Sequence, residues 1–136
     1  MTVRLVAQGG LRNPPIRSIL PLLKRNQLMR KIETEMNAAI SEQREWQKDN
    51  TMVTHADGIT FVFLHGNCIA QLGDFFIRLF DGGFQTKTTK SRLNAILSAH
   101  GESGDRVFQK KGEWFVTMNT VQGLSTIPFW NSMRLG

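Results

Sequence analysis

The residues best suited to chemistry lie together in residues 82–94, which read Gly-Gly-Phe-Gln-Thr-Lys-Thr-Thr-Lys-Ser-Arg-Leu-Asn. Gly82 and Gly83 permit close backbone approach to a ligand, while the threonines supply hydroxyl groups and a helix cap. A helix that begins here offers unpaired backbone amides, which bind anions. The stretch therefore predicts a site for a phosphate-bearing ligand.

The charges in this stretch favour the same interpretation. Lys87, Lys90 and Arg92 crowd the first turns of the expected helix, where the helix dipole favours acidic residues. No Asp or Glu occurs between Asp81 and Glu102. A bound phosphate would turn the repulsion among these cations into attraction. Cations at a helix start are unfavourable for stability, so their presence here indicates function.

Phe84, at the turn before the helix, could provide a ring on which a base stacks, and Lys90 and Asn94 should share one helical face. The alternative is an ordinary strand-turn-helix junction, with solvated lysines and Phe84 in the core. The glycine-to-lysine spacing of a Walker-type phosphate loop is absent, and so is the dinucleotide-binding glycine pattern.

Catalytic groups are not assembled in the sequence. His55, His65 and His100 are scattered, and no nucleophile motif or pair of carboxylates lies beside them. His65 and Cys68 are close, but zinc needs three or four ligands and no second pair exists. We expect no catalytic residue, no metal and no cofactor, with His65 and Asn67 either lining the ligand pocket or ending a hairpin.

The elements that position these residues follow from periodicity. Residues 22–48 predict a long helix, because apolar or long side chains recur at helical spacing: Leu28, Ile32, Met36, Ala39, Ile40 and Gln43. An apolar seam of this length on a small protein also favours an oligomer.

From residue 51 onward the pattern alternates, and Asp57-Gly58 is typical of a tight hairpin turn. Strands are expected at residues 51–55, 59–64, 68–72, 75–80, 106–110 and 114–118, and a helix at 88–99 that Gly101 terminates. On the strand 106–110, Arg106 and Lys110 should point the same way as Phe108. The apolar tail with Pro128, Phe129, Trp130 and Met133 should fold back on the body.

We therefore predict an α+β fold with a long N-terminal helix, an antiparallel sheet of hairpins and a second, shorter helix. The 136 residues should form one domain: residues 1–15 an irregular arm, 16–49 mainly helical, and 50–136 the antiparallel sheet plus helix.

Composition limits the functional classes. The net charge of +6 favours anionic partners, and no acidic residue precedes Glu33, so a nucleic-acid-binding protein that uses a basic N-terminal face is the alternative function. One cysteine, Cys68, fits a reducing compartment such as the cytoplasm. No apolar run is long enough to span a membrane.

A set of short motifs resembles a family of small phage proteins, the Thoeris anti-defence sponges. The resemblance covers residues 59–133 and is carried by Gly82-Gly83-Phe84, Thr86, Thr88-Thr89-Lys90, Arg92, Asn94, Arg106-Val-Phe-Gln-Lys110, Trp114-Phe-Val116 and Pro128-Phe129 through Met133. Phe84 stands where many relatives have Trp, and Ser132 where a Gly is common.

The resemblance implies a phage protein that acts in the cytoplasm of the infected bacterial host. It would sequester glycocyclic ADP-ribose, an immune signal made by TIR-domain enzymes, or related cyclic oligonucleotides, without cleaving them. It implies a dimer or hexamer. By the same analogy, Phe84 would stack on the base and Asn94 would bond the ligand, while Thr88, Thr89, Arg92 and Arg106 would contact phosphate or ribose.

Overall fold

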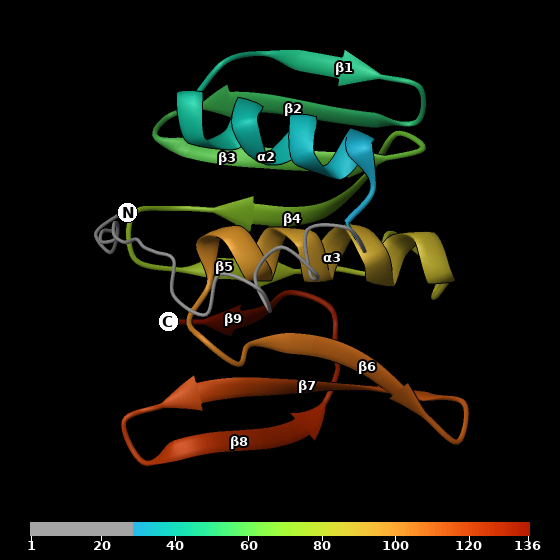
Figure 1. The fold of residues 1–136 in the computed structure, drawn as a ribbon, viewed down its shortest axis with the longest axis vertical. Coiled ribbons are helices and arrows are strands. Elements are labelled where there is room, and N and C mark those ends of the chain that lie inside the picture. Colours follow the sequence, from blue (N-terminus) through green and yellow to red (C-terminus); the bar gives the residue numbers. More distant parts are fainter. Residues whose placement is uncertain (1–28) are drawn as a thin grey trace.

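The computed structural model describes residues 29–136. This part of the chain has two helices and nine strands, and the strands form two antiparallel sheets. Sheet A has the strand order β1-β2-β3-β4-β5-β9, and sheet B has the order β6-β7-β8 (Figure 1). The strands of sheet A are β1 (Trp46–Lys48), β2 (Thr51–Ala56), β3 (Ile59–Leu64), β4 (Asn67–Leu72), β5 (Ile77–Leu79) and β9 (Met133–Leu135). Those of sheet B are β6 (Arg106–Lys110), β7 (Glu113–Thr120) and β8 (Gly123–Pro128).

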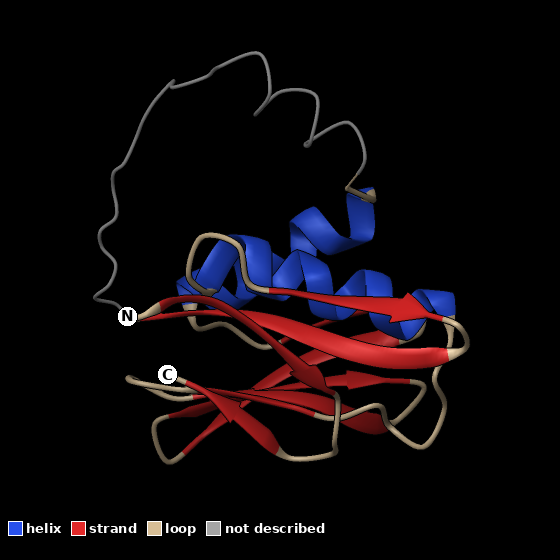
Figure 2. Cartoon of the chain, turned by 90° about the horizontal axis from the view of Figure 1, so that it is seen from below, coloured by secondary structure: helices blue, strands red, loops and turns tan. Residues whose placement is uncertain are grey.

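The two helices, α2 (Lys31–Glu42) and α3 (Lys87–His100), lie on one side of the strands (Figure 2). Met36 and Ala39 of α2 are fully buried, as are Leu93 and Ile96 of α3. They join the buried residues of both sheets in one hydrophobic core, which includes Trp114 of sheet B. The helices are also tied to each other, since the Asn37 side-chain amide donates to the Ala95 carbonyl at 3.0 Å.

The expected long N-terminal helix over residues 22–48 is wrong for its described part. Helix α2 ends at Glu42 because Gln43 adopts a left-handed conformation, and the amides of Gln43 and Arg44 then cap the carbonyls of Ile40 and Ala39. Trp46 begins strand β1 instead, pairing with Val53. Residues 22–28 lie outside the described residues, as does the expected arm over residues 1–15.

The expected fold class also needs correction in its proportions. Strands dominate the described residues, and they form two sheets where the pattern predicted one. Helix α3, expected to be the shorter, has 14 residues against 12 for α2. Strands β1, β8 and β9 were not predicted. Strands β1 and β9 have only three residues each, and β8 is almost wholly exposed and lacks an alternating apolar pattern.

Several local predictions are confirmed. The hairpin at Asp57-Gly58 joins β2 to β3, with Ala56 paired to Ile59. Helix α3 spans the expected residues, and Gly101 is its C-cap. The apolar tail folds back as expected: β9 pairs with β5, so Met133 lies opposite Leu79 and is buried.

The apolar seam of α2 is filled within the chain. The helix packs against α3 and against strands β1 and β2. Its stripe of Met36, Ala39 and Ile40 therefore has partners without a second subunit.

Candidate functional site

Three turns meet at one edge of the molecule, the end at which α3 begins (Figure 1). The β1–β2 turn and the β3–β4 turn are joined there because the His65 amide donates to the Asn50 carbonyl at 2.8 Å. The loop before α3 lies against the β3–β4 turn: a Cβ at Gly82 would stand 3.3 Å from the Asn67 Cβ. Gly82 has a φ of 68°, so this close approach and this backbone both favour glycine.

The loop that leads into α3 is held by its own side chains. The Asp81 carboxylate accepts from the Gly83 amide at 2.8 Å and from the Gln85 side chain at 3.3 Å. Thr86 is the N-cap, and its hydroxyl oxygen accepts from the Thr89 amide at 3.1 Å. The single acid of this loop is therefore already engaged, and the backbone of the helix start is fixed.

Thr89, expected to contact phosphate or ribose, is buried. Its hydroxyl lies 2.9 Å from that of Thr86 and donates to the Phe84 carbonyl at 3.2 Å. Thr88 is half-buried in the same turn. The structure thus gives Thr89 a role in shaping the loop beneath Phe84.

Arg92 is only 3% exposed and its guanidinium has three partners within the chain. Nη1 donates to the Glu33 carboxylate at 2.8 Å, Nε to the Thr51 hydroxyl at 3.0 Å, and Nη2 to the Asn50 side chain at 3.2 Å. The same Glu33 oxygen accepts from the Ser91 hydroxyl at 2.6 Å. Arg92 therefore ties α3 to α2 and to the β1–β2 turn.

Asn94 is bonded to the edge of sheet B. Its side-chain oxygen accepts from the Val107 amide at 2.7 Å, and its side-chain nitrogen donates to the Val107 carbonyl at 2.8 Å. Because both polar atoms are used, the side chain acts as a substitute for a neighbouring strand. Asn94 and Lys90 do share a helical face, since Lys90 donates to the Gln109 side chain of the same strand at 3.3 Å.

Arg106 lies away from the loop. Lys90 is beside Gln109, near the far end of β6, whereas Arg106 begins that strand. Its guanidinium stands 4.6 Å from the centre of the Phe108 ring, on the same face of sheet B as predicted. Phe108 in turn stacks on Phe115, with ring centres 5.7 Å apart.

Phe84 is 67% exposed, so its ring is not part of the core. Lys87, at the start of α3, is exposed as well, and Lys90 is half-exposed. Phe84 and Lys87 therefore present much of their surface to solvent, whereas Thr89 and Arg92 are buried.

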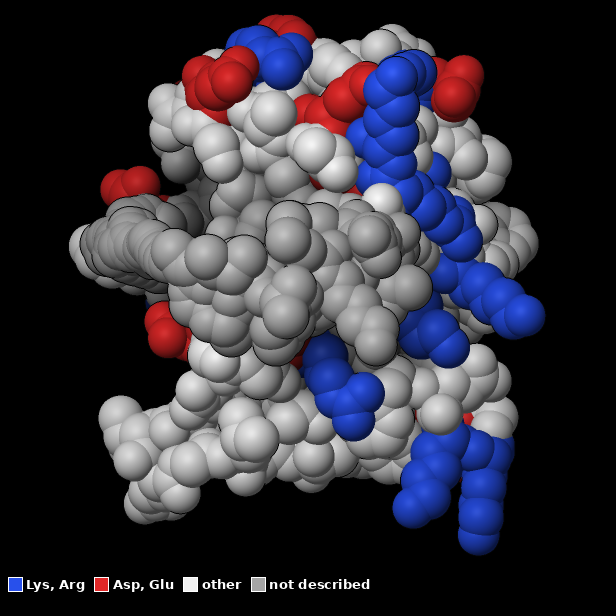
Figure 3. Space-filling model, in the orientation of Figure 1, with Lys and Arg blue, Asp and Glu red and all other residues white. Residues whose placement is uncertain are grey.

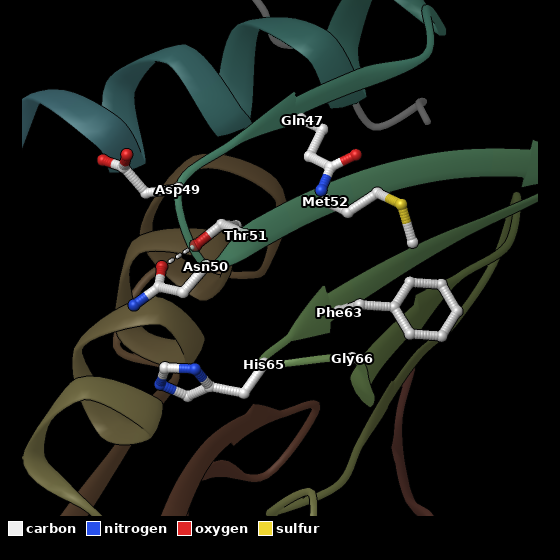
Figure 4. A pocket seen from close by; sticks show the side chains of 8 residues that line it. All are labelled: Gln47, Asp49, Asn50, Thr51, Met52, Phe63, His65 and Gly66. Carbon is white, nitrogen blue, oxygen red and sulfur yellow. Dashed lines mark hydrogen bonds between the residues drawn. The ribbon is translucent and has the colours of Figure 1, made fainter.

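A hollow of about 330 Å³ lies at the same edge, between the β1–β2 and β3–β4 turns (Figure 4). His65 and Phe63 border it on one side, and Asn50 and Thr51 on the other, with Asn50 bridging to Arg92. The full lining is Gln47, Asp49, Asn50, Thr51, Met52, Phe63, His65 and Gly66. Sequence reasoning identified His65 but missed Asn50, although Asp49-Asn50 is a pair typical of turns.

Lys and Arg side chains run down one side of the molecule (Figure 3). Exposed or half-exposed cations occur at the starts of α2 and α3 and at the β6–β7 turn, which lie along that side in Figure 1. We call this set the basic edge: Arg30, Lys31, Lys87, Lys90, Lys110 and Lys111. Glu33 lies near it but is buried beneath Arg92, so its charge is neutralised internally.

Within residues 29–136 there is no group of three or more His, Cys, Asp or Glu side chains placed to hold a metal ion. Neither helix in that range is long and apolar enough to cross a membrane. Burial raises the pKa of the Cys68 thiol above its ordinary value, which disfavours the reactive thiolate.

Residues 29–136 match the family model described as Kyanoviridae Gp96 protein. No curated protein and no solved structure matches the chain.

Proposed function

This chain belongs to the Kyanoviridae Gp96 family and is therefore a phage protein, and we propose that it is a non-catalytic binding protein for an anionic nucleotide ligand at the start of α3. More specifically, we propose that the ligand is a nucleotide-derived immune signal, either glycocyclic ADP-ribose or a cyclic oligonucleotide. The protein would sequester it in the cytoplasm of the infected host and so inhibit defence.

The observation that carries the proposal is the exposure of Phe84 in the loop before a helix whose first turn holds cations and no acid. A Phe ring that is 67% exposed gives up burial that would stabilise the fold. It lies three residues before Lys87 and six before Lys90, in the loop that leads into a helix with no acid in its first turn. An aromatic surface next to positive charge suits a base linked to phosphate.

The other predicted residues divide into two groups under this proposal. His65 and Asn67 would approach the ligand from the β3–β4 turn, which lies against Gly82. Arg92 and Asn94 would act indirectly, because their polar atoms hold α3 in place.

Titration calorimetry with glycocyclic ADP-ribose and with cyclic oligonucleotides tests the proposal. We expect binding at micromolar protein that is weakened at least tenfold by Phe84→Ala. Phe75→Ala is the matched control, because Phe75 is also an exposed phenylalanine in a loop but belongs to the β4–β5 connection. Recovery of unaltered ligand from the heat-denatured complex would support binding without cleavage.

Absence of heat with all of these compounds would remove the immune-signal form of the proposal. Equal weakening by Phe84→Ala and Phe75→Ala would remove the site. Sedimentation of the bound and free protein would test whether the pocket is completed in a dimer or a hexamer.

The alternative function, nucleic-acid binding through a basic N-terminal face, depends mainly on residues before Met29, which lie outside the described residues. Arg30 and Lys31 of the basic edge continue that charge and are exposed. Binding of this kind should weaken steeply with salt, whereas stacking on Phe84 should depend on salt much less.

A further inference from the structure

The face of sheet A that points away from the helices is partly open. Burial alternates along β3: Thr60, Val62 and Leu64 are buried, whereas Phe61 and Phe63 between them are half-exposed. Because successive side chains of a strand point to opposite faces, Phe61 and Phe63 share the face opposite the helices. Figure 2 shows both helices on the other side.

The strand register identifies the neighbours of these two rings. Phe63 lies between Met52 of β2 and Cys68 of β4, and Phe61 lies opposite Gln71. Figure 4 shows the Met52 side chain and the Phe63 ring on the same side of their strands. The two rings therefore share the face with Met52 and Cys68 beside Phe63, and with the polar residues Thr54 and Gln71 beside Phe61.

One edge of this face, formed by β5 and β9, is positively charged. Arg78 of β5 pairs with Gln71, and Arg134 of β9 pairs with Arg78, so both arginines lie on the same face as Phe61. Their guanidinium groups stand 5.7 and 5.0 Å from the centre of the Phe76 ring. In the described part of the chain, none of the six strands of sheet A contains Asp or Glu.

We propose that this face of sheet A binds single-stranded nucleic acid. Phe61 and Phe63 are two residues apart on one strand, which separates their side chains by about 6.6 Å and allows two successive bases of an extended strand to stack on them. Arg78 and Arg134 would meet the phosphates. The site shares no residue with the start of α3, although Phe63 also borders the hollow beside His65, so the two proposed sites adjoin at the β3–β4 turn.

Charge decides against a second copy of this chain as the occupant. A symmetric interface over this face would add the positive charges of Arg78 and Arg134 from both copies, while the strands of sheet A offer no carboxylate to pair with them. A polyanion supplies the missing charge along its whole length.

Fluorescence anisotropy with labelled twelve-nucleotide oligo(dT) and oligo(U) tests this site on the full chain. We expect micromolar binding that Phe61→Leu/Phe63→Leu weakens by at least about fivefold, because Leu preserves apolar volume but removes the stacking surface. Arg78→Gln/Arg134→Gln should weaken binding and lower its salt dependence. Lys110→Gln/Lys111→Gln, with the same loss of charge on the β6–β7 turn, is the control and should have the smaller effect.

Three results would overturn the proposal. One is no binding of either oligonucleotide by the folded wild type. Another is equal loss in the Lys110/Lys111 control and in the Arg78/Arg134 variant. The third is sedimentation of the wild type as a dimer that Phe61→Leu/Phe63→Leu converts to a monomer. Should the double leucine variant fail to fold by circular dichroism, the Arg78/Arg134 variant alone decides, because it leaves the core intact.

Discussion

Arg92 and Glu33 form a buried ion pair that joins the two helices, with the Arg92 Nη1 atom 2.8 Å from the Glu33 Oε2 atom. Only 4% and 2% of the two side chains are exposed. Removing one charge leaves the other buried and unpaired, so we expect Arg92→Met or Glu33→Gln to lower the free energy of unfolding by about 3–5 kcal/mol. Urea denaturation measures this.

The double variant Glu33→Leu/Arg92→Met should lose less stability than either single variant, because no unpaired charge remains. Lys87→Gln, an exposed cation on the same helix, should change the unfolding free energy by less than about 0.5 kcal/mol. If Arg92→Met keeps wild-type stability but fails to bind ligand, Arg92 contacts the ligand directly and this prediction is wrong.

Asn94 should contribute to stability through its paired bonds to Val107. Asn94→Asp keeps the acceptor for the Val107 amide but turns a carboxylate oxygen toward the Val107 carbonyl, so we expect a loss of about 1–3 kcal/mol. Hydrogen exchange at the Val107 amide should become faster. Ser98→Ala, at an exposed position of the same helix, should leave both measurements unchanged.

Gly82 should tolerate substitution less well than Gly83. Both residues have positive φ angles, 68° and 93°, so alanine is strained at either one. At Gly82, however, a Cβ would also stand 3.2 Å from Ile69 and 3.3 Å from Asn67, whereas at Gly83 it meets nothing within 4 Å. Thermal unfolding should show the lower midpoint for Gly82→Ala, and equal midpoints would count against the tight contact.

Cys68 should react slowly with alkylating reagents. Burial raises the pKa of its thiol above the ordinary value of 9.0, partly offset by bonds to the Ala70 carbonyl and Gln71. The folded state therefore favours the neutral thiol; its contribution to stability is present below the unfolded pKa and is lost as pH rises through the folded one. Iodoacetamide rates measured against pH should show a later rise for the folded chain than for the chain in urea.

The sequence predicted best those elements that carry their own local signals. Asp57-Gly58 marked one hairpin, and the glycine after His100 marked the end of α3. The end of α2 carried no such signal, because Gln43 rarely adopts a left-handed backbone. The apolar stripe had in fact ended at Ile40, since the next positions on that face are Gln43 and Gln47.

The candidate site was predicted as one continuous stretch of sequence. In the structure, tertiary contacts bury some of its residues and leave others exposed. Arg92 and Lys87 look alike as basic residues of one helix start, but only Arg92 meets a carboxylate, 59 residues away in the chain. Likewise, the β1–β2 turn enters the site through Asn50, and no periodicity links Asn50 to His65. From the sequence, an exposed Phe84 and a Phe84 in the core were equally consistent with the pattern. The structure shows that Phe84 is exposed.

Sheet A is interrupted in the sequence, because α3 and the whole of sheet B lie between β5 and β9. The final pairing, Leu79 with Met133, closes a loop of more than fifty residues. Such a closure costs chain entropy that only the finished structure repays, so assembly of β9 should come late in folding. Trp46 in one sheet and Trp114 in the other should then report a single cooperative transition, with neither sheet surviving the loss of its neighbour.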